Sequence, residues 1–342
     1  MEERSYWLGF STISGVGPAK FRKLLEKYKT AKKAWEELKP EFSIEKYLQE
    51  LKKKNVWFIT LLDEEYPKLL KEIKSPPFIL YGKGDRSLLN DGNTIGIVGA
   101  RRTTEYGREV TRILTSELVL NGLTIVSGLA LGVDAISHMI TLENKGRTIA
   151  VLGCGVDCCN PRENQSIYDN ILRSRNCIVS EFPLGMKPTQ WTFPARNRII
   201  AGLSQAVLVT EGAEDSGSLI TAQFALKFGR KVFAVPGPIT SQMSKGPYKL
   251  ISKGAKLVTS GEDILKDLKF KINDLKTKKT LKKGDSEEEN LILKLLQNEQ
   301  LHFDEIVRLT KFKSAKLSGI LSLMELKGLI KSLDSGYFSI GS

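Results

Sequence analysis

The chain has 342 residues, 41% of them hydrophobic, which is enough for two or three domains with buried cores. No run approaches the ~20 apolar residues of a membrane span, and the first residues, Met-Glu-Glu-Arg, lack the pattern of a signal peptide. Four cysteines without a secretory signal favour a reducing compartment, so we expect a cytoplasmic protein that does not contact a membrane.

Residue types that bind metals are too few and too scattered for a metal site. The only histidines, His138 and His302, are far apart in the sequence. Cys154, Cys158 and Cys159 lack a second Cys or His pair at zinc-ligand spacing, so buried or loop thiols are the better interpretation. We therefore expect no metal and no cofactor.

The net charge of +13 is unevenly distributed. Residues 1–75 carry a net +4 and residues 76–265 a net +5, whereas the short segment 266–285 alone carries +5 and residues 286–342 carry −1. A diffuse lysine excess is often a solvated surface. The charge is therefore compatible with polyanion binding but does not establish it.

Residues 1–75 are predicted to form a small helical N-terminal domain. The segment Ile13–Lys20 resembles the turn of a helix–hairpin–helix or SAM-like domain. Its glycines would let backbone N–H groups approach a phosphate, and Pro18 suits the first position of the next helix. A packed helical hairpin without a ligand explains the same residues equally well.

Residues 76–265 are predicted to form the central domain, because they repeat a pattern of strand, small-residue loop and helix. The predicted strands are Thr94–Val98, Leu123–Val126, Thr148–Leu152 and Ala206–Thr210. Such repeats imply an α/β fold, a Rossmann-like parallel sheet with helices on both faces. Its loops gather at the carboxyl edge of the strands, where ligands bind.

The loop after the second of these strands holds Gly128 and Gly132 in a tight turn that leads into a helix. Such a turn directs backbone N–H groups toward an anion. It is not the Gly-x-Gly-x-x-Gly fingerprint, and no Gly-Lys-Ser/Thr follows it, so neither dinucleotide binding nor nucleotide hydrolysis is indicated. Close packing of strand and helix explains one such loop as well, but four loops accompanied by arginines favour a phosphate-rich ligand.

The predicted site combines arginines, hydroxyls and backbone N–H groups that together follow several phosphates. Guanidinium groups bind phosphate through paired hydrogen bonds and stack on bases. Phe182, Trp191 and Phe193 are candidates for stacking, although ordinary packing explains them equally well. The predicted DNA-binding residues are Arg101, Arg102, Thr104, Ser127, Gly128, Lys187, Arg196, Asn197, Arg198, Ser216, Gly217 and Ser218.

An enzyme is the main alternative to a binding protein. No Gly-x-Ser-x-Gly surrounds a serine, and His138 follows Asp134 by four residues on one predicted helix face, so we expect a hydrogen-bonded structural histidine rather than a catalytic triad. Carboxylates near strand ends, Glu181, Glu211 and Asp215, keep open a hydrolase of nucleotide N-glycosidic bonds. One arginine suffices for a monophosphate, whereas four are present here. This favours a non-enzymatic binder of single-stranded DNA.

The C-terminal residues are predicted to form a Lys-rich linker, 266–285, and a winged helix, 286–342, with three helices and a hairpin. A winged helix that reads DNA normally carries an electropositive recognition helix. Here the candidate helix has only Lys316 and Lys327, with Glu325 between them. A structural or protein-contacting module is therefore favoured, and a regulator that binds duplex promoters is not.

Five segments resemble motifs of the DNA-processing protein A family, DprA, also called Smf, in family order and spacing from about Tyr66 to Leu265. Two departures are Asn160-Pro161, where the family usually has Tyr-Pro, and Pro247–Ile251, where Asn-x-Leu-Ile is common. Neither affects a charged or Gly-Ser position. The matching segments are Gly99–Gly107, Ser127–His138, Phe193–Ser204, Ser216–Ala222 and Val232–Gly237.

The resemblance implies a function that the residues alone do not. A member of this family is expected to protect incoming single strands during natural transformation and to load the RecA recombinase onto them in DNA recombination. It is also expected to form a homodimer through the central domain, and it often carries a C-terminal winged helix.

Overall fold

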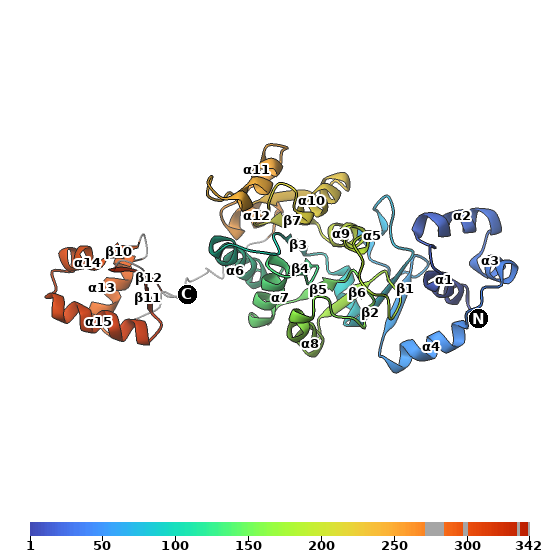
Figure 1. Cartoon of the computed structure of the whole chain (residues 1–342), viewed down its shortest axis with the longest axis horizontal. Coiled ribbons are helices and arrows are strands. Elements are labelled where there is room, and N and C mark those ends of the chain that lie inside the picture. The colour runs from blue at the N-terminus through green and yellow to red at the C-terminus, as the bar shows by residue number, and fades with distance from the viewer. Residues whose placement is uncertain (271–283, 297–299, 334–335, 341–342) are drawn as a thin grey trace. The chain divides into compact units, whose positions relative to one another are not determined.

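The computed structural model describes residues 1–270, 284–296, 300–333 and 336–340. The chain divides into two compact units, residues 1–272 and 273–342, and each is described by itself (Figure 1). Most of the predicted Lys-rich linker, residues 271–283, lies outside the described residues. None of the described helices is long and apolar enough to span a membrane.

A nine-stranded sheet forms the centre of the first unit. Strands β3 to β9 run parallel to one another, while β1 and β2 extend one edge as antiparallel strands. The fold prediction, a Rossmann-like parallel sheet with flanking helices, is thereby confirmed. In sheet order the strands are β1 (Trp57–Thr60), β2 (Ile79–Gly84), β6 (Cys177–Ser180), β5 (Thr148–Val151), β4 (Thr124–Ser127), β3 (Thr94–Val98), β7 (Ala206–Val209), β8 (Lys231–Ala234) and β9 (Lys256–Leu257).

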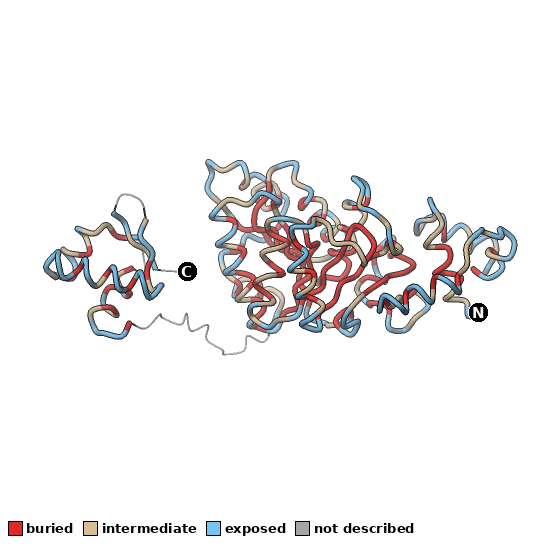
Figure 2. Tube along the Cα trace, turned by 60° about the horizontal axis from the view of Figure 1, so that its bottom comes forward, coloured by how far each residue is buried: buried red, intermediate tan, exposed pale blue. Residues whose placement is uncertain are grey.

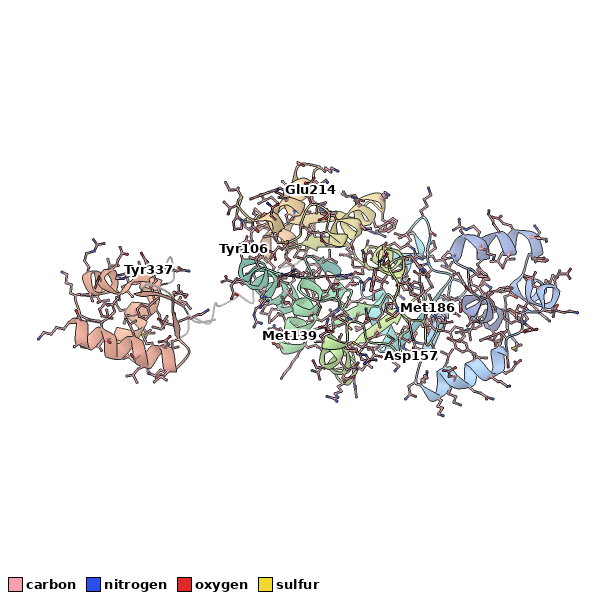
Figure 3. All side chains as sticks on the ribbon, in the orientation of Figure 1. Tyr106, Met139, Asp157, Met186, Glu214 and Tyr337 are labelled. Carbon is pink, nitrogen blue, oxygen red and sulfur yellow. The ribbon has the colours of Figure 1, made fainter. Side chains whose placement is uncertain are left out.

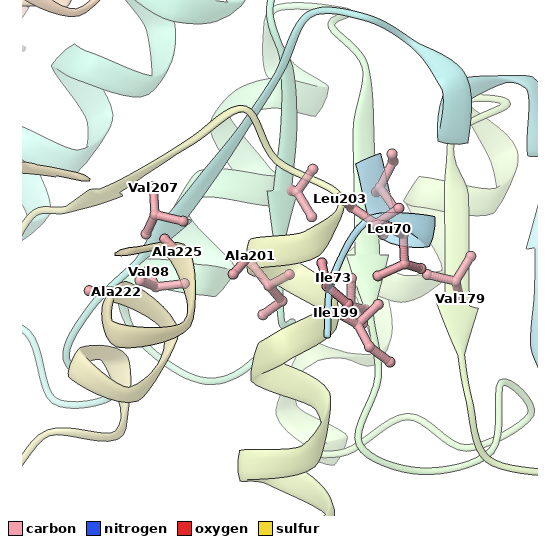
Figure 4. Close-up of a cluster of buried hydrophobic side chains, with 14 of the residues drawn as sticks. Leu70, Ile73, Val98, Val179, Ile199, Ala201, Leu203, Val207, Ala222 and Ala225 are labelled. Carbon is pink, nitrogen blue, oxygen red and sulfur yellow. The ribbon is translucent and has the colours of Figure 1, made fainter. Parts of the chain in front are cut away.

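Helices cover both faces of the sheet because alternate strand residues point to opposite sides. Val98 packs on one face with helices α5, α9, α10 and α11 (Figure 4). Ile95 and Ile97 pack on the other face with α6, α7 and α12. The backbone of the sheet is largely buried (Figure 2). The helices are α5 (Lys68–Lys71), α6 (Glu105–Leu120), α7 (Val133–Glu143), α8 (Gln165–Arg173), α9 (Thr192–Gly202), α10 (Gly217–Lys227), α11 (Lys245–Ile251) and α12 (Gly261–Asp267), with short 3-10 turns η1 (Arg86–Asn90), η2 (Arg162–Asn164) and η3 (Gln242–Ser244).

Four helices precede the sheet and share an aromatic core: α1 (Glu3–Thr12), α2 (Pro18–Tyr28), α3 (Ala31–Leu38) and α4 (Ile44–Lys53). Trp7 and Phe21 pack there against Phe78, which directly precedes β2. Because β1 also pairs with β2, the boundary predicted near residue 75 cuts through continuous structure. The predicted helical hairpin is present, and α2 begins at Pro18.

The central domain extends beyond its predicted end near Leu265. Helix α12 continues to Asp267, and Leu268 and Phe270 pack against the cluster of buried side chains on the α6 face. The sequence placed these residues in the linker because lysines flank them, but their apolar side chains belong to the core.

The second unit has its own hydrophobic core and the winged-helix order of elements. The predicted hairpin is present as β11 and β12, and Leu301–His302 adds a short third strand that the sequence did not indicate. Residues 334 and 335, which the sequence predicts to lie in the hairpin, are outside the described residues. The elements are α13 (Glu287–Leu296), β10 (Leu301–His302), α14 (Phe303–Thr310), α15 (Ser314–Leu326), β11 (Ile330–Ser332) and β12 (Tyr337–Ile340).

Candidate nucleic-acid interface

A pocket of about 500 Å³ lies where the order of the parallel strands reverses. Strand β3 has β4 on one side and β7 on the other, so the loops after β3 and β7 diverge and leave a crevice at their carboxyl ends. Most residues that line it come from the loops after β3 and β7 and from α9 and α10. These include Arg101, Arg102, Phe193, Arg196, Asn197, Ser216, Gly217 and Ser218.

Arg101 and Arg102 supply exposed positive charge at this pocket. The Arg101 guanidinium lies 5.1 Å from the centre of the Phe193 ring, a cation–π contact that positions the guanidinium without neutralising it. No carboxylate among the described residues forms an ion pair with either arginine. Both are therefore available to an anionic ligand.

Arg196 is not available in the same way, which corrects its predicted role as a phosphate ligand. Its side chain is only 4% exposed, and its Nη1 donates to the carbonyl oxygens of Gly128 and Val151. Burial lowers the pKa of Arg196, while the nearby Asp134 carboxylate opposes that shift. This arginine ties α9 to the ends of β4 and β5 and forms part of the pocket wall.

The turn after β4 is occupied by the protein's own carboxylate. Asp134, in the first turn of α7, accepts from the backbone N–H groups of Gly128 and Ala130 at 3.1 and 3.4 Å. Burial raises the pKa of Asp134, and Arg196 opposes the rise.

The Ser127 hydroxyl is buried and donates to the Ile97 carbonyl at 2.7 Å. Internal partners therefore use the Ser127 hydroxyl and the Gly128 N–H group, so the structure does not support the predicted contacts of these groups with DNA.

Arg198 forms a buried ion pair with Glu181, at the carboxyl end of β6. The guanidinium nitrogen and carboxylate oxygen are 2.5 Å apart, and the Arg198 and Glu181 side chains are 12% and 9% exposed. Burial raises the pKa of Glu181, and Arg198 opposes the rise. Arg198 thus neutralises Glu181, which corrects its predicted role as a ligand of DNA.

Thr104 and Glu211 connect the loops after β3 and β7. Glu211 accepts from the Thr104 backbone N–H at 3.0 Å and from its hydroxyl at 2.5 Å. Thr104 also caps α6 by accepting from the Gly107 N–H. A side chain at Gly107 would collide with the Glu211 carboxylate. Thr104 therefore shapes the β3 loop rather than binding DNA directly, which corrects its prediction.

The N-terminus of α10 lies at the pocket, and its DNA binding stays a prediction. Ser216 caps the helix, with its hydroxyl 2.8 Å from that of Ser218. Gly217 is exposed, and a Cβ there would meet nothing within 4 Å. Asn197 bridges from α9, because its Nδ2 donates to the Gly217 carbonyl at 3.2 Å. Small side chains and an open approach leave this helix end accessible to a phosphate.

The loop after β7 is also held to α11, because Glu214, which Figure 3 labels, pairs with Lys249 of α11 at 3.0 Å. This contact removes Glu214 from the free acidic groups near the pocket. The pocket lining also includes residues that were not predicted, for example Gln190, Ile220 and Met243, because nothing in their local sequence separates them from ordinary loop and helix residues.

Lys187 and Trp191 extend the candidate surface along the loop before α9. Lys187 is exposed and has no ion-pair partner in the part of the chain that the structure describes. Trp191 is 59% exposed, and its ring meets Phe182 edge to face at 5.6 Å. Phe182 is buried. Trp191 is thus the accessible one of this pair for stacking on a base.

His138 is a buried structural residue, as predicted, but its partner differs. Its Nδ1 lies 2.7 Å from the Thr148 hydroxyl of β5, whereas Asp134 bonds the turn after β4. Its Nε2 is buried without a hydrogen bond among the described residues. No group of three or more His, Cys, Asp or Glu among those residues forms a metal site.

We expect His138 to make the fold sensitive to mild acid. Burial and nearby Arg196 lower the pKa of His138 to about 3. Because an unfolded histidine titrates near 6.5, its stabilising contribution is complete above that pH and is lost as the pH falls toward 3. At about pH 5 the loss is roughly 2 kcal/mol, at about 1.4 kcal/mol per pKa unit.

Thermal melts from about pH 7.5 to about pH 5 measure this effect. The melting temperature of the parent chain should fall, and it should fall less in His138→Gln, which retains a group able to bond Thr148. Equal pH dependence in the two proteins would contradict the assignment.

The winged helix offers little free positive charge on its candidate recognition helix. Lys316 pairs with Glu288 at 2.5 Å, and Lys327 pairs with Asp285 at 2.8 Å and Glu289 at 2.7 Å. Both lysines named from the sequence are thus neutralised within the unit. This supports the expectation that the module is structural or contacts protein.

The family model described as DNA recombination-mediator protein A matches residues 57–269. The chain belongs to this family, DprA. A separate model, the DprA winged helix domain, matches residues 276–336. The family prediction is therefore confirmed over both the sheet and the C-terminal module.

Named relatives agree with this assignment. The DNA processing protein DprA of Bacillus subtilis is 48% identical over 210 residues, which cover 61% of this chain and 70% of that protein. The protein Smf of Synechocystis is 40% identical over 290 residues, or 78% of this chain and 73% of the relative.

Two solved structures share the fold. DprA from Streptococcus pneumoniae is 36% identical, with a TM-score of 0.66 over 78% of this chain and 99% of that chain. DprA from Helicobacter pylori is 32% identical, with a TM-score of 0.56 over 62% of this chain and 95% of that chain, and its structure is described as giving insight into a single-stranded-DNA binding mode.

Proposed function

We propose that this DprA-family chain binds single-stranded DNA across the pocket between β3 and β7. The observation that carries the proposal is that Arg101 and Arg102, which form no ion pair among the described residues, line the same pocket as the N-terminus of α10. Arginine side chains and free helix N-termini are both phosphate ligands. Lys187 extends the cationic surface along the strand.

Accessible aromatic surface supports a single strand rather than a duplex at this site. Unpaired bases can stack on flat side chains. The bases of a duplex already stack on one another and are not free to do so. Trp191 is exposed beside the pocket loop, and the Phe193 ring lies under the Arg101 guanidinium. The relative from Helicobacter pylori, described as binding single-stranded DNA, supports the same ligand.

Binding without catalysis fits the carboxylates better than hydrolysis. Glu181 forms an ion pair with Arg198, and Glu211 accepts a hydrogen bond from the Thr104 hydroxyl. Asp215 is exposed on the β7 loop and has no buried environment that would adapt it for acid–base chemistry. The N-glycosidic hydrolase thus lacks a suitable pair of acidic groups among the described residues.

Family membership supports a proposal for the biological role. We place the chain in natural transformation, where it protects incoming single strands, loads the RecA recombinase onto them and promotes DNA recombination. In this role it acts in the cytoplasm as a homodimer joined through the central domain, without a metal or cofactor.

The substitution Gly217→Val tests the helix end directly. Its side chain extends into open space, so the protein should fold normally while phosphate approach to the α10 backbone is blocked. Affinity for a short oligothymidylate should fall about tenfold, which is about 1.4 kcal/mol. Fluorescence anisotropy measures it.

Gly92→Val is the matched control, because Gly92 is exposed, has the same open surroundings and lies outside the pocket lining. It should bind like the parent chain. If Gly217→Val is folded and binds with undiminished affinity, the α10 end does not contact DNA.

A further inference from the structure

The basic surplus of the N-terminal helices is concentrated in one segment. Residues 18–39, which span α2 and α3, hold eight lysines and arginines against three glutamates. The rest of residues 1–75 holds eight basic and nine acidic residues. The net charge of that block therefore comes from these two helices and is not diffuse.

Three lysines of this segment form one exposed face of α2. Lys20, Lys23 and Lys27 are spaced three and four residues apart, so they follow one side of the helix over about 10 Å. None of them pairs with a carboxylate of the described residues. Lys27 instead lies 4.8 Å from the centre of the Tyr28 ring. The face thus presents uncompensated charge to solvent.

The turn that leads into α2 is open as well. A Cβ at Gly15 or Gly17 would meet nothing within 4 Å, and no side chain caps the helix. The neighbouring α3 differs, because Glu3 accepts from its first backbone N–H groups. The lysine face and the open turn are adjacent, so an extended polyanion could contact both.

This surface has no exposed aromatic ring for base stacking. Within residues 1–56, all of which the structure describes, Trp7 and Phe21 are buried, and the Tyr28 ring is covered by Lys27. A surface that meets only phosphates does not require unpaired bases. A duplex, which carries about one charge per 1.7 Å of axis, supplies the densest row of phosphates for it.

We propose that Lys20, Lys23 and Lys27 of α2, with the Gly15–Gly17 turn, form a second DNA surface that binds the phosphate backbone of a duplex without reading its sequence. The proposal extends the proposed function, since it assumes that the chain acts on DNA. The two sites are separate: α1–α4 lie beside edge strand β1, and four strands separate β1 from β3 at the pocket (Figure 1).

The test uses the full chain and a duplex of about 20 base pairs of arbitrary sequence, with anisotropy measured from about 50 to 200 mM salt. The triple variant Lys20→Ala/Lys23→Ala/Lys27→Ala should lose at least about tenfold in duplex affinity, and its slope of log K against log salt should be shallower by about 2 to 3. Alanine favours a helix, so α2 should remain folded, as circular dichroism verifies.

The matched control removes the same charge from α4. Lys46→Ala/Lys52→Ala/Lys53→Ala takes three exposed, unpaired lysines from the neighbouring helix. It should leave duplex affinity within about twofold of the parent. Equal losses in the two triple variants would show that only total charge matters and would overturn the proposal, as would a folded α2 variant with full duplex affinity.

Two further measurements distinguish duplex binding at α2 from single-strand binding at the pocket and from binding of α2 to a membrane surface. The α2 variant should still bind a short oligothymidylate, whereas Arg101→Ala/Lys187→Ala should lose that ligand and retain the duplex. If Arg101→Ala/Lys187→Ala loses the oligothymidylate but the α2 variant keeps the duplex, the pocket is supported and the α2 surface is contradicted. If the α2 variant loses the duplex but Arg101→Ala/Lys187→Ala keeps the oligothymidylate, the pocket is contradicted. Binding to phosphatidylserine vesicles through α2, without duplex binding, would overturn the DNA assignment.

Discussion

Replacing Arg196 with alanine should destabilise the protein strongly. The substitution leaves the carbonyls of Gly128 and Val151 without their donor and the Asp134 carboxylate buried without a nearby positive charge. Removing one partner of a buried charged network costs about 3–5 kcal/mol. At about 2–4 °C per kcal/mol for a domain of this size, the melting temperature should fall by roughly 10 °C or more.

Arg101→Ala is the control for that measurement. Arg101 is exposed and has no ion pair in the described structure, so its removal should change stability by less than about 0.5 kcal/mol. Scanning calorimetry of both variants compares a buried arginine with a surface one in the same site. Equal melting temperatures for Arg196→Ala and the parent chain would show that the buried contacts of Arg196 contribute little.

The triple variant Arg101→Ala/Arg102→Ala/Lys187→Ala should lose most affinity for a short oligothymidylate. Each phosphate neutralised on a single strand contributes about −0.7 to the slope of log K against log salt, so three free cations predict a slope of about −2 for the parent chain. Removing them should cost about a hundredfold near 0.1 M salt, or about 3 kcal/mol.

The salt slope also tests the corrected arginine roles. If Arg196 and Arg198 bound phosphates too, the slope would be near −3.5. Fluorescence anisotropy at several salt concentrations gives both quantities, and the α4 triple variant, Lys46→Ala/Lys52→Ala/Lys53→Ala, controls for total charge. A slope near zero in the parent chain, or full affinity in the triple variant, would place the DNA elsewhere.

The fold followed well from the sequence because its signal is local. Apolar runs of strand length alternate with helical patterns in the central domain, and that alternation permits few arrangements other than a parallel sheet. The added edge strand β1 was less predictable, since its antiparallel pairing with β2 joins segments on either side of a Pro-Pro turn. The extension of the central domain to Phe270 was not predicted, because the lysines around it suggested a linker.

The site was harder to predict because the same residue type serves different purposes. Arg101 and Arg196 look equally suited to phosphate in the sequence, yet one is exposed and the other is buried. A helical signal could have separated them: Arg196 lies three and four residues before Ile199 and Ile200, so it shares their buried face. Exposed Arg101 precedes its helix and has no such constraint.

The capping residues show a second limit. Thr104 directly precedes α6, and a threonine in that position commonly bonds its own helix. That signal was available. By contrast, the bond from Thr104 to Glu211 joins loops 107 residues apart, and no local pattern indicates it. Internal acceptors such as Asp134 and Glu211 became visible only in three dimensions.

The central claim is that a single DNA strand crosses the pocket between β3 and β7, and photo-crosslinking tests it most directly. The full chain would be irradiated with a short oligonucleotide that carries 5-iodouracil, and the crosslinked peptides would be identified by mass spectrometry. Stacking places bases against exposed aromatic side chains. We expect crosslinks at Trp191 or Phe193, lost in the Arg101→Ala/Arg102→Ala/Lys187→Ala variant. Crosslinks confined to the winged helix, for example at Tyr337, would contradict the account.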